Sequence, residues 1–172
     1  MTITLIGMPA VGKSYMGKSI AKKFNMKLVD GDKVIVKTDG RPLQRIIDEE
    51  GLDGFKRIEE ETLLGINDED IVFTPGGSAV YYPAVMDKFK KSGIVIYLYA
   101  SAETISNRAV DFSKRGVVLK EGMTMLDLYN ERAPLFEKYA DITVNCDGVE
   151  FGKYKHNAIR KSEEYLNKSG QK

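Results

Sequence analysis

Cysteine, histidine and tryptophan are scarce in this chain of 172 residues, which has one cysteine, one histidine and no tryptophan. A single cysteine, Cys146, cannot form an internal disulfide, and its use is typical of a protein in a reducing compartment. Because no histidine lies near it in the sequence, a Cys–His nucleophile is not indicated. We expect Cys146, which follows the apolar stretch "DITVN", to be packed at the end of a strand.

The sequence also lacks an excess of one charge and any long apolar run. Lys and Arg number 26 against 25 Asp and Glu, so no overall field favours nucleic acid. No apolar run approaches the length that spans a membrane, and no signal peptide precedes the apolar stretch at the start. We therefore expect a cytoplasmic monomer that has no nucleic-acid or membrane partner and acts on a small molecule.

Short apolar segments alternate with amphipathic segments along the chain. We expect strands at residues 2–6, 27–30, 70–73, 94–99 and 141–144. We expect helices at residues 13–24, 42–50, 52–65, 79–91, 102–110, 123–138 and 152–167. Strands separated by helices favour an α/β fold, with a parallel sheet covered by helices on both faces. Such sheets bind ligands beyond the carboxyl ends of their strands, so the segment after each strand matters most.

The stretch "GMPAVGKSY", residues 7–15, joins the first expected strand to the first expected helix. Its spacing, G-x-x-x-x-G-K-S, describes a loop whose backbone N–H groups cradle phosphates, with Lys13 on the outer phosphates and Ser14 on Mg²⁺. The helix that follows adds its partial positive charge. The alternative is a glycine-rich turn without a ligand. We expect ATP and Mg²⁺, with nucleotide contacts at Gly7, Ala10, Val11, Gly12, Lys13, Ser14 and Tyr15.

Two carboxylates, Asp30 and Asp32, follow the second expected strand in the stretch "DGD". Phosphoryl transfer needs Mg²⁺ on the phosphates and a carboxylate that accepts the proton of the attacking hydroxyl. We expect one aspartate for each task. The alternative is that one of them merely caps a helix that begins at Lys33.

The stretch "PGGSA", residues 75–79, follows the third expected strand. It is consistent with a plain turn before a helix. Two consecutive glycines before a helix also form a second nest for an anion or a hydroxyl, and the sequence leaves both interpretations open.

A basic segment, residues 111–122, interrupts the helical periodicity and carries Lys114, Arg115 and Lys120, with glycines at 116 and 122. Such a loop is typical of a mobile lid that closes over nucleotide phosphates. Arg108 precedes it on the expected helix, and the alternative for Arg108 is a solvated surface arginine.

The chain resembles the shikimate kinases, within the nucleoside-monophosphate-kinase-like group of P-loop folds. The matching stretches run in family order from residue 3 to about residue 144: "GMPAVGKS", "LVDGD", "EEGLDGFKRIEEE", "TPGGSAV", "IVIYLYAS", "KRGVVL" and "ERAPLFEKYAD". Many families share the phosphate loop, whereas "GFKRIEEE", "GGSAV" and "ERAPLF" are more particular to this one. The resemblance implies transfer of the γ-phosphate of ATP to the 3-hydroxyl of shikimate, a step of aromatic amino acid biosynthesis.

The resemblance also implies roles for single residues. Asp32 would bind the shikimate hydroxyls and act as base, Asp30 would hold Mg²⁺ through water, and Arg132 would grip the substrate carboxylate. The remaining implied substrate contacts are Phe55, Lys56, Gly76, Gly77 and Ser78.

For the nucleotide, the resemblance implies contacts from Arg115 of the lid and from Arg108. The implied catalytic residues are Lys13, Asp32 and Arg115. The chain would be a single domain, with its core at 1–32, 66–110 and 123–172, a helical substrate-binding region at 33–65 and a lid at 111–122.

The sequence departs from the family pattern at several of these positions. Lys56 stands where the family usually has an arginine that grips the carboxylate, and we expect Glu59 to orient this cation from the same helix. The triple glycine is Gly76-Gly77-Ser78 here, and the usual Arg-Pro of the lid is Arg115-Gly116. The adenine-binding segment is not recognisable in "NCDGVEFGK". Two alternatives stay open: a kinase of another hydroxylated carboxylate such as gluconate, and a nucleotide-binding module without turnover.

Overall fold

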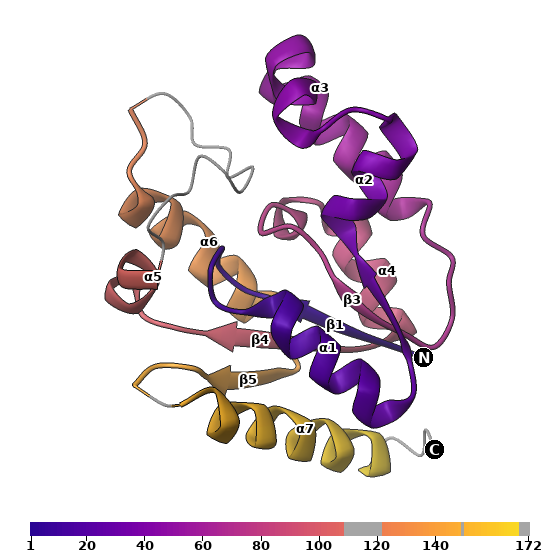
Figure 1. Cartoon of the computed structure of the whole chain (residues 1–172), viewed down its shortest axis with the longest axis vertical. Helices are drawn as coiled ribbons and strands as arrows, with labels where there is room; N and C mark the ends of the chain where they lie inside the picture. The colour runs from indigo at the N-terminus through magenta and orange to yellow at the C-terminus, as the bar shows by residue number, and fades with distance from the viewer. Residues whose placement is uncertain (109–121, 149, 169–172) are drawn as a thin grey trace.

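The computed structural model describes residues 1–108, 122–148 and 150–168 (Figure 1). Within these ranges, five strands form one parallel sheet in the order β2-β3-β1-β4-β5. The strands are β1 (Thr2–Ile6), β2 (Lys27–Asp30), β3 (Ile71–Thr74), β4 (Gly93–Tyr99) and β5 (Ile142–Asn145). The predicted α/β fold is therefore confirmed, and β3 and β5 each begin one residue later than expected.

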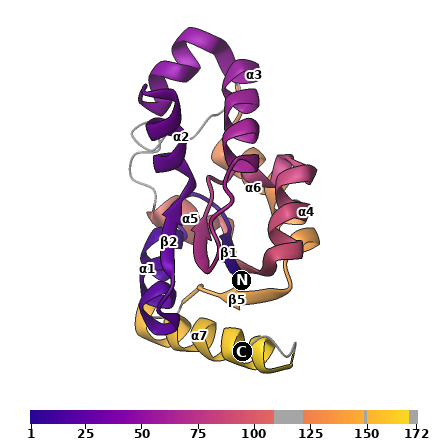
Figure 2. The same ribbon diagram turned by 90° about the vertical axis from the view of Figure 1, so that its right-hand side faces the viewer.

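Helices cover both faces of the sheet, which makes three layers. The helices α1 (Lys13–Phe24) and α7 (Phe151–Lys168) pack on one face, and α4 (Pro83–Ser92) and α6 (Met125–Tyr139) pack on the other (Figure 2). Every residue of β1 is buried, as expected for a central strand of a parallel sheet. Its apolar, β-branched sequence "TITLI" fits an environment without water on either face.

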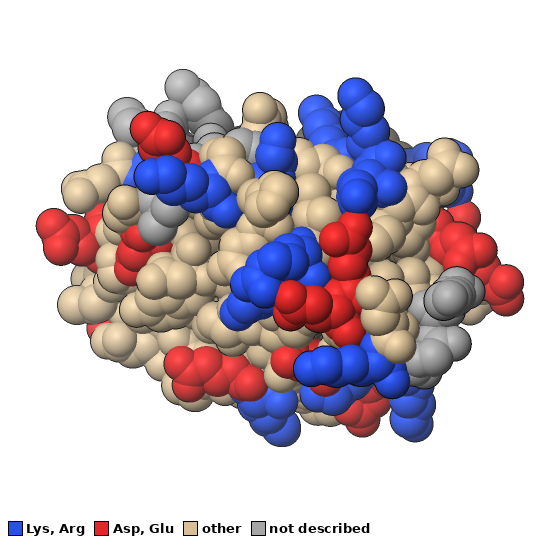
Figure 3. Space-filling model, turned by 90° about the horizontal axis from the view of Figure 1, so that it is seen from below, with Lys and Arg blue, Asp and Glu red and all other residues tan. Residues whose placement is uncertain are grey.

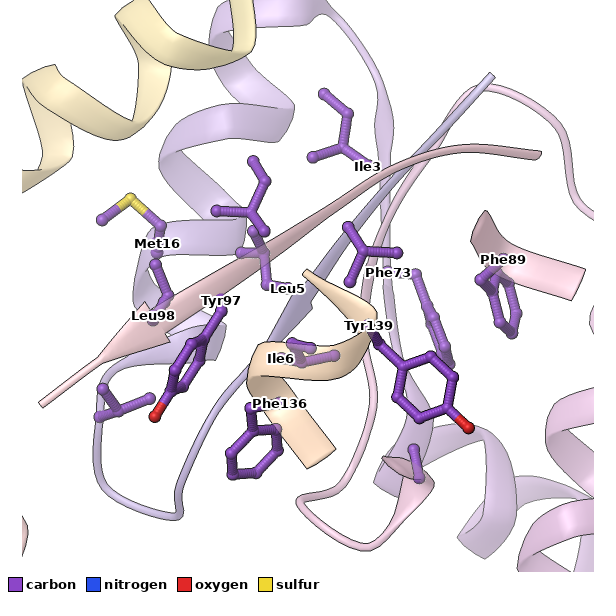
Figure 4. Packing of buried hydrophobic residues seen from close by; sticks show 14 of the residues in the cluster. Ile3, Leu5, Ile6, Met16, Phe73, Phe89, Tyr97, Leu98, Phe136 and Tyr139 are labelled. Carbon is purple, nitrogen blue, oxygen red and sulfur yellow. The ribbon is translucent and has the colours of Figure 1, made fainter. Parts of the chain in front are cut away.

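Two aromatic pairs fix the α4 and α6 layer against the strands. Phe73 of β3 stacks on Phe89 of α4 with 4.2 Å between ring centroids, and Tyr97 of β4 stacks on Phe136 of α6 at 5.2 Å (Figure 4). Large buried rings contribute more to packing than most side chains. The position of α6 matters for function, because this helix carries Arg132.

Two helices, α2 (Gly31–Asp39) and α3 (Leu43–Leu64), project away from the sheet beyond the end of β2 (Figures 1 and 2). Gly51 has φ 69° and ψ −179°, which kinks α3 and separates the two helices expected at 42–50 and 52–65. The left-handed φ explains why a glycine stands there.

The helix α2 was absent from the expected helices and appeared only in the capping alternative, as a helix from Lys33. Its sequence "GDKVIVKTD" is rich in β-branched residues, which do not favour a helix. The caps at its two ends stabilise the helix in spite of this low helix propensity. Asp30 is its N-cap, and Gly40 ends it in the left-handed conformation with φ 87°. A small separate core joins α2 to α3 and consists of Ile35, Ile46 and Phe55.

The helix expected at 79–91 is in fact a short 3₁₀ turn, η1 (Ala79–Tyr81), followed by α4. Pro83 explains the interruption, since proline is favoured in the first turn of a helix but cannot donate a hydrogen bond within one. After β4 comes α5 (Ala102–Arg108). Of the predicted lid, only Gly122 lies within the described residues, so the lid and the division into functional regions stay predictions.

Cys146 is fully buried directly after β5, which confirms the expected packed position. Burial raises the pKa of its thiol to about 12. On the face shown in Figure 3, basic and acidic side chains are interspersed, so that face carries no field of one sign. Among the described residues, no helix combines the length and the apolar character needed to cross a bilayer.

Gly17 lets α1 approach the sheet closely, and this generates a stability prediction. A Cβ at Gly17 would lie 2.8 Å from Cγ2 of Thr74 and 2.9 Å from Cδ1 of Leu28. We expect Gly17→Ala to lower the free energy of unfolding by about 1–3 kcal/mol through overpacking. Gly152, in α7, has no atom within 4 Å of such a Cβ, so Gly152→Ala should stabilise by up to about 1 kcal/mol. Urea unfolding of both variants checks this, and stabilisation by Gly17→Ala would contradict the close approach.

Candidate active site

A cavity of about 520 Å³ lies beyond the carboxyl ends of β1, β2 and β3, where a parallel sheet is expected to bind its ligand. Segments that are far apart in the sequence meet there because these strands are neighbours. Its lining residues are Pro9, Ala10, Gly12, Lys13, Ser14, Tyr15, Asp30, Asp32, Leu43, Phe55, Glu59, Thr74, Pro75, Gly76, Gly77, Ser78 and Arg132.

The loop between β1 and α1 has the backbone that its glycines predict. Gly7 has φ 146°, and a Cβ there would lie 2.6 Å from the carbonyl oxygen of Leu98. Gly12 has φ 104° and is the N-cap of α1 without a side-chain cap, so the first N–H groups of the helix point to the cavity end. Gly7 and Val11 shape the loop from behind and are not lining residues, whereas Ala10 lines the cavity with φ 65°.

Lys13 is the cation at the centre of this loop. Its Nζ donates to the carbonyl oxygens of Gly7 at 2.8 Å and Met8 at 3.1 Å. Burial lowers the pKa of Lys13 to about 8; the nearby Asp32 raises it, and Arg132 lowers it further. Within the described ranges, no carboxylate lies at ion-pair distance from Lys13. The ammonium is therefore a partly buried charge without an ionic partner, which an anionic ligand would stabilise.

The two aspartates after β2 have different surroundings. Asp30 accepts a long 3.4 Å hydrogen bond from the backbone N–H of Lys33 and so caps α2, and it also lines the cavity. Asp32 lies in the first turn of α2 and lines the cavity. Burial, and then the charge of Asp30, raise the pKa of Asp32, while Lys13 lowers it. Asp32 is therefore a more basic carboxylate than an exposed aspartate.

Glu59 of α3 is buried in the wall of the same cavity, and its partners differ from our expectation. Its Oε1 accepts a 2.7 Å hydrogen bond from Ser78, and its Oε2 accepts one of 2.7 Å from Tyr82. The expectation that Glu59 orients Lys56 is wrong: the Nζ of Lys56 lies 3.5 Å from Asp53 instead. No local sequence pattern indicates Tyr82 as a partner, because its place depends on how η1 and α4 pack.

The two glycines after β3, Gly76 and Gly77, leave room for charged side chains that lie close to the backbone there. A Cβ at Gly76 would lie 3.0 Å from Oδ1 of Asp32 and 3.0 Å from Oε1 of Glu59. A Cβ at Gly77 would lie 2.8 Å from Nη1 of Arg132. The glycines thus allow two carboxylates and a guanidinium to converge on one loop, which is more than a plain turn requires.

Arg132 reaches the cavity from the buried face of α6. Its side chain is 4% exposed, its Nε donates to Oη of Tyr81 at 3.1 Å, and its guanidinium lies over the Tyr81 ring at 5.2 Å. These contacts hold the planar group in one orientation and leave its Nη1 against Gly77. A hydrogen-bonded box between Thr124 and Asp127 fixes the start of this helix.

A second cavity of about 310 Å³ adjoins the first, and Phe55, Ser78 and Arg132 line both. Lys56 lines this second cavity and not the first. The two expected carboxylate grips, Lys56 and Arg132, therefore share a wall of the second cavity. Its other lining residues are Leu52, Tyr81, Tyr82, Met123, Leu128 and Glu131.

The remaining expected nucleotide contacts lie elsewhere. The Nη2 of Arg108 donates to the carbonyl oxygen of Cys146 at 2.9 Å, so this arginine is anchored beside the end of β5 rather than free in solvent. Arg115 lies outside the described residues. In the described part of the chain, no group of three or more His, Cys, Asp or Glu side chains forms a metal cluster. Ser14, Asp30 and Asp32 are among the oxygen donors that line the cavity, and Mg²⁺ prefers oxygen ligands and retains several that are not from protein.

Comparison with known proteins gives one consistent result. A family model described as "Shikimate kinase" matches residues 9–159. Shikimate kinase 1 of Salmonella newport is 32% identical over 149 residues, which cover 84% of this chain and 86% of that protein. The solved shikimate kinase of Acinetobacter baumannii in complex with shikimate has a TM-score of 0.82 at 24% identity and covers 97% of this chain and 93% of its own.

Two further solved structures show how the fold varies. The shikimate kinase of Aquifex aeolicus has a TM-score of 0.81 at 23% identity, with coverage of 99% of this chain and 98% of its own. A gluconokinase of Sinorhizobium meliloti has a TM-score of 0.55 at 16% identity, covering 98% of this chain and 97% of its own. Similarity at these identities shows a shared fold and nothing more.

The raised pKa of Asp32 predicts that this side chain destabilises the protein. Its ionised form is disfavoured in the folded state relative to the unfolded chain, so the cost is present above the folded pKa and disappears as the pH falls through it. We expect Asp32→Asn to raise Tm near neutral pH. Calorimetry should show the gain shrinking as the pH falls toward about 4. A lower Tm at neutral pH would mean that the carboxylate is structural.

The lowered pKa of Lys13 predicts a pH-dependent affinity for ATP. The free enzyme loses its ammonium as the pH rises through about 8, so the Kd for ATP should increase across that range. Isothermal titration calorimetry between about pH 7 and pH 10 measures this, with Lys13→Met as the control that should lack the dependence. An equal dependence in the control would assign the titration to another group.

Proposed function

We propose, because this chain belongs to the shikimate kinase family, that it transfers the γ-phosphoryl group of ATP to the 3-hydroxyl of shikimate. Membership in this family makes the chain a kinase that uses ATP. The observation that carries the choice of acceptor is the convergence of Lys13, Asp32 and Arg132 on one cavity. That set offers a cation for phosphate, a basic carboxylate for a hydroxyl and a second cation for an acid group.

On the nucleotide side, the loop of residues 7–12 and the start of α1 would hold the phosphates. Lys13 would exchange its two carbonyl partners for phosphate oxygens, which offset its charge far better in a buried site. Ser14 and Asp30 would hold Mg²⁺, and this ion neutralises charge on the phosphate oxygens when bound. Arg108 and Arg115 remain proposed nucleotide contacts.

On the acceptor side, Asp32 would accept the proton of the attacking hydroxyl. Its burial makes it more basic than an ordinary aspartate, which suits a general base. Arg132 would bind the carboxylate, since a planar guanidinium held by Tyr81 can make two parallel hydrogen bonds. Phe55, Gly76, Gly77 and Ser78 would complete the walls around the ring.

The direct test is ADP release with shikimate, with gluconate and with no added acceptor. We expect turnover with shikimate alone and a phosphorus NMR signal for a 3-phosphate ester. Lys13→Ala should abolish turnover, because the cation offsets charge on the transferred group. Turnover with gluconate but not with shikimate would show that the acceptor is another hydroxylated carboxylate. ATP binding without ADP release in any arm would indicate a binding module.

Lys56 supplies a second prediction about the acceptor. An ammonium attracts a carboxylate but cannot reproduce the two-pronged geometry of a guanidinium. We expect Lys56→Arg to lower KM for shikimate several-fold, a change of about 1 kcal/mol, and Lys56→Ala to raise it with little effect on KM for ATP. Arg57, which is exposed on the same helix, gives the matched control Arg57→Ala. Steady-state kinetics that are identical in Lys56→Ala and the wild type would exclude Lys56 from acceptor binding.

A further inference from the structure

Glu59 is a carboxylate in the wall of the acceptor cavity that is held by hydroxyl groups instead of a cation. Its side chain is 1% exposed, and each of its oxygens accepts one 2.7 Å hydrogen bond, from Ser78 and from Tyr82. Among the residues that the structure describes, no lysine or arginine lies at ion-pair distance from it. Three segments that meet only in the folded chain are thereby tied together: α3, the loop after β3 and the start of α4.

The two hydroxyl donors matter for the charge of Glu59. Burial raises the pKa of Glu59 above its ordinary value and the nearby Asp32 adds to this, while the hydrogen bonds from Ser78 and Tyr82 and the charge of Arg132 offset it only in part. Each hydroxyl stabilises the ionised carboxylate because it gives that carboxylate a proton to accept. An ionised carboxylate can only accept hydrogen bonds, and each oxygen of Glu59 accepts one here, so the hydroxyl protons of both partners point toward it.

The orientation of the Ser78 hydroxyl has a consequence for the ligand. A serine hydroxyl has one proton to donate and two lone pairs that accept. The proton of Ser78 is committed to Glu59, and Ser78 lines both cavities. Its oxygen therefore faces the ligand as a hydrogen-bond acceptor. Such a group pairs with an O–H of the ligand and repels a carboxylate or phosphate oxygen.

This acceptor lies on one side of a polarised cavity. The carboxylates of Asp32 and Glu59 both lie beside Gly76, because this glycine has no side chain. The guanidinium of Arg132 lies beside Gly77 for the same reason. The carboxylates, which bind hydroxyl groups, are thus next to Gly76, and the guanidinium, which binds a carboxylate, is next to Gly77. A ligand with hydroxyls at one end and an acid group at the other fits this polarity in one orientation.

We propose that Ser78, with Glu59 as its positioning residue, selects acceptors that carry a second hydroxyl besides the one that is phosphorylated. The proposal rests on the proposed function and deepens it by naming the side chain that recognises a second hydroxyl of the acceptor. Asp32 would accept the proton of the reacting hydroxyl, and Ser78 would accept a hydrogen bond from a neighbouring hydroxyl.

The test is a cycle that pairs enzyme variants with substrate analogues. The kcat/KM of the wild type is measured for shikimate and for its two analogues that lack the 4-hydroxyl or the 5-hydroxyl. We expect one analogue to lose about tenfold or more, since a buried polar group left without its partner is costly. In Ser78→Ala that loss should be about threefold or less, because the hydroxyl that accepts the hydrogen bond from the substrate is missing. Ser78→Thr keeps the hydroxyl and should restore discrimination.

Variants at the two partners separate positioning from general stability. In Glu59→Gln, one side of the amide donates instead of accepting, so Ser78 loses its fixed orientation. We expect discrimination to fall as in Ser78→Ala, through a higher KM for shikimate with a smaller change in kcat. Tyr82→Phe removes the other donor on Glu59 but leaves Ser78 bonded, so it should lower Tm yet keep discrimination.

The outcomes distinguish this proposal from the function on which it rests. If the wild type does not phosphorylate shikimate, the proposed function fails and this inference fails with it. If the wild type phosphorylates shikimate but Ser78→Ala discriminates as strongly as the wild type, the function stands and this proposal alone is overturned. Loss of discrimination in Tyr82→Phe would likewise overturn the assignment to Ser78.

Discussion

Four charged side chains gather in one cavity without ion pairs between them, and the rest of this structure depends on this constraint. Glu59 and Arg132 are buried, and Lys13 and Asp32 are partly buried. Lys13, Asp32, Glu59 and Arg132 all line the same cavity, and the described residues include no direct salt bridge among them. Burying a charge without a partner of opposite sign is costly, and the shifted pKa values of Lys13 and Asp32 express that cost. A ligand that carries phosphate, hydroxyl and carboxylate groups would relieve this cost, so the cavity holds these charges together at the expense of stability.

The fold concentrates these charges through ordinary packing. β1, β2 and β3 are neighbours in the sheet, so the loops that follow them meet at one edge. Arg132 reaches the cavity from the helix layer that contains α4 and α6. It lies on the buried face of α6, four residues from both Leu128 and Phe136. The stacking of Phe136 on Tyr97 therefore also sets the position of the guanidinium. Glycines at 76 and 77 leave the space into which these side chains reach.

Much of this arrangement could be predicted from local sequence, because strands, the phosphate loop and the carboxyl edge of a parallel sheet follow local rules. The helix α2 could not be predicted from its β-branched residues, since its stability comes from the cap at Asp30, the turn at Gly40 and packing against α3. The partners of Glu59 were also mispredicted. Spacing along a helix pointed to Lys56, whereas the packing of α4 places Tyr82 closer. Roles that fall in residues 109–121, Arg115 among them, stay predictions.

The most direct measurement of the central claim is a crystal structure of the protein with ADP, Mg²⁺ and shikimate. We expect shikimate in the cavity beside Gly76 and Gly77, with its 3-hydroxyl hydrogen-bonded to Asp32 and its carboxylate on Arg132. We also expect Lys13 to leave the carbonyl oxygens of Gly7 and Met8 for the nucleotide phosphates. A structure in which the carboxylate faces Asp32, or in which shikimate binds outside this cavity, would contradict the account.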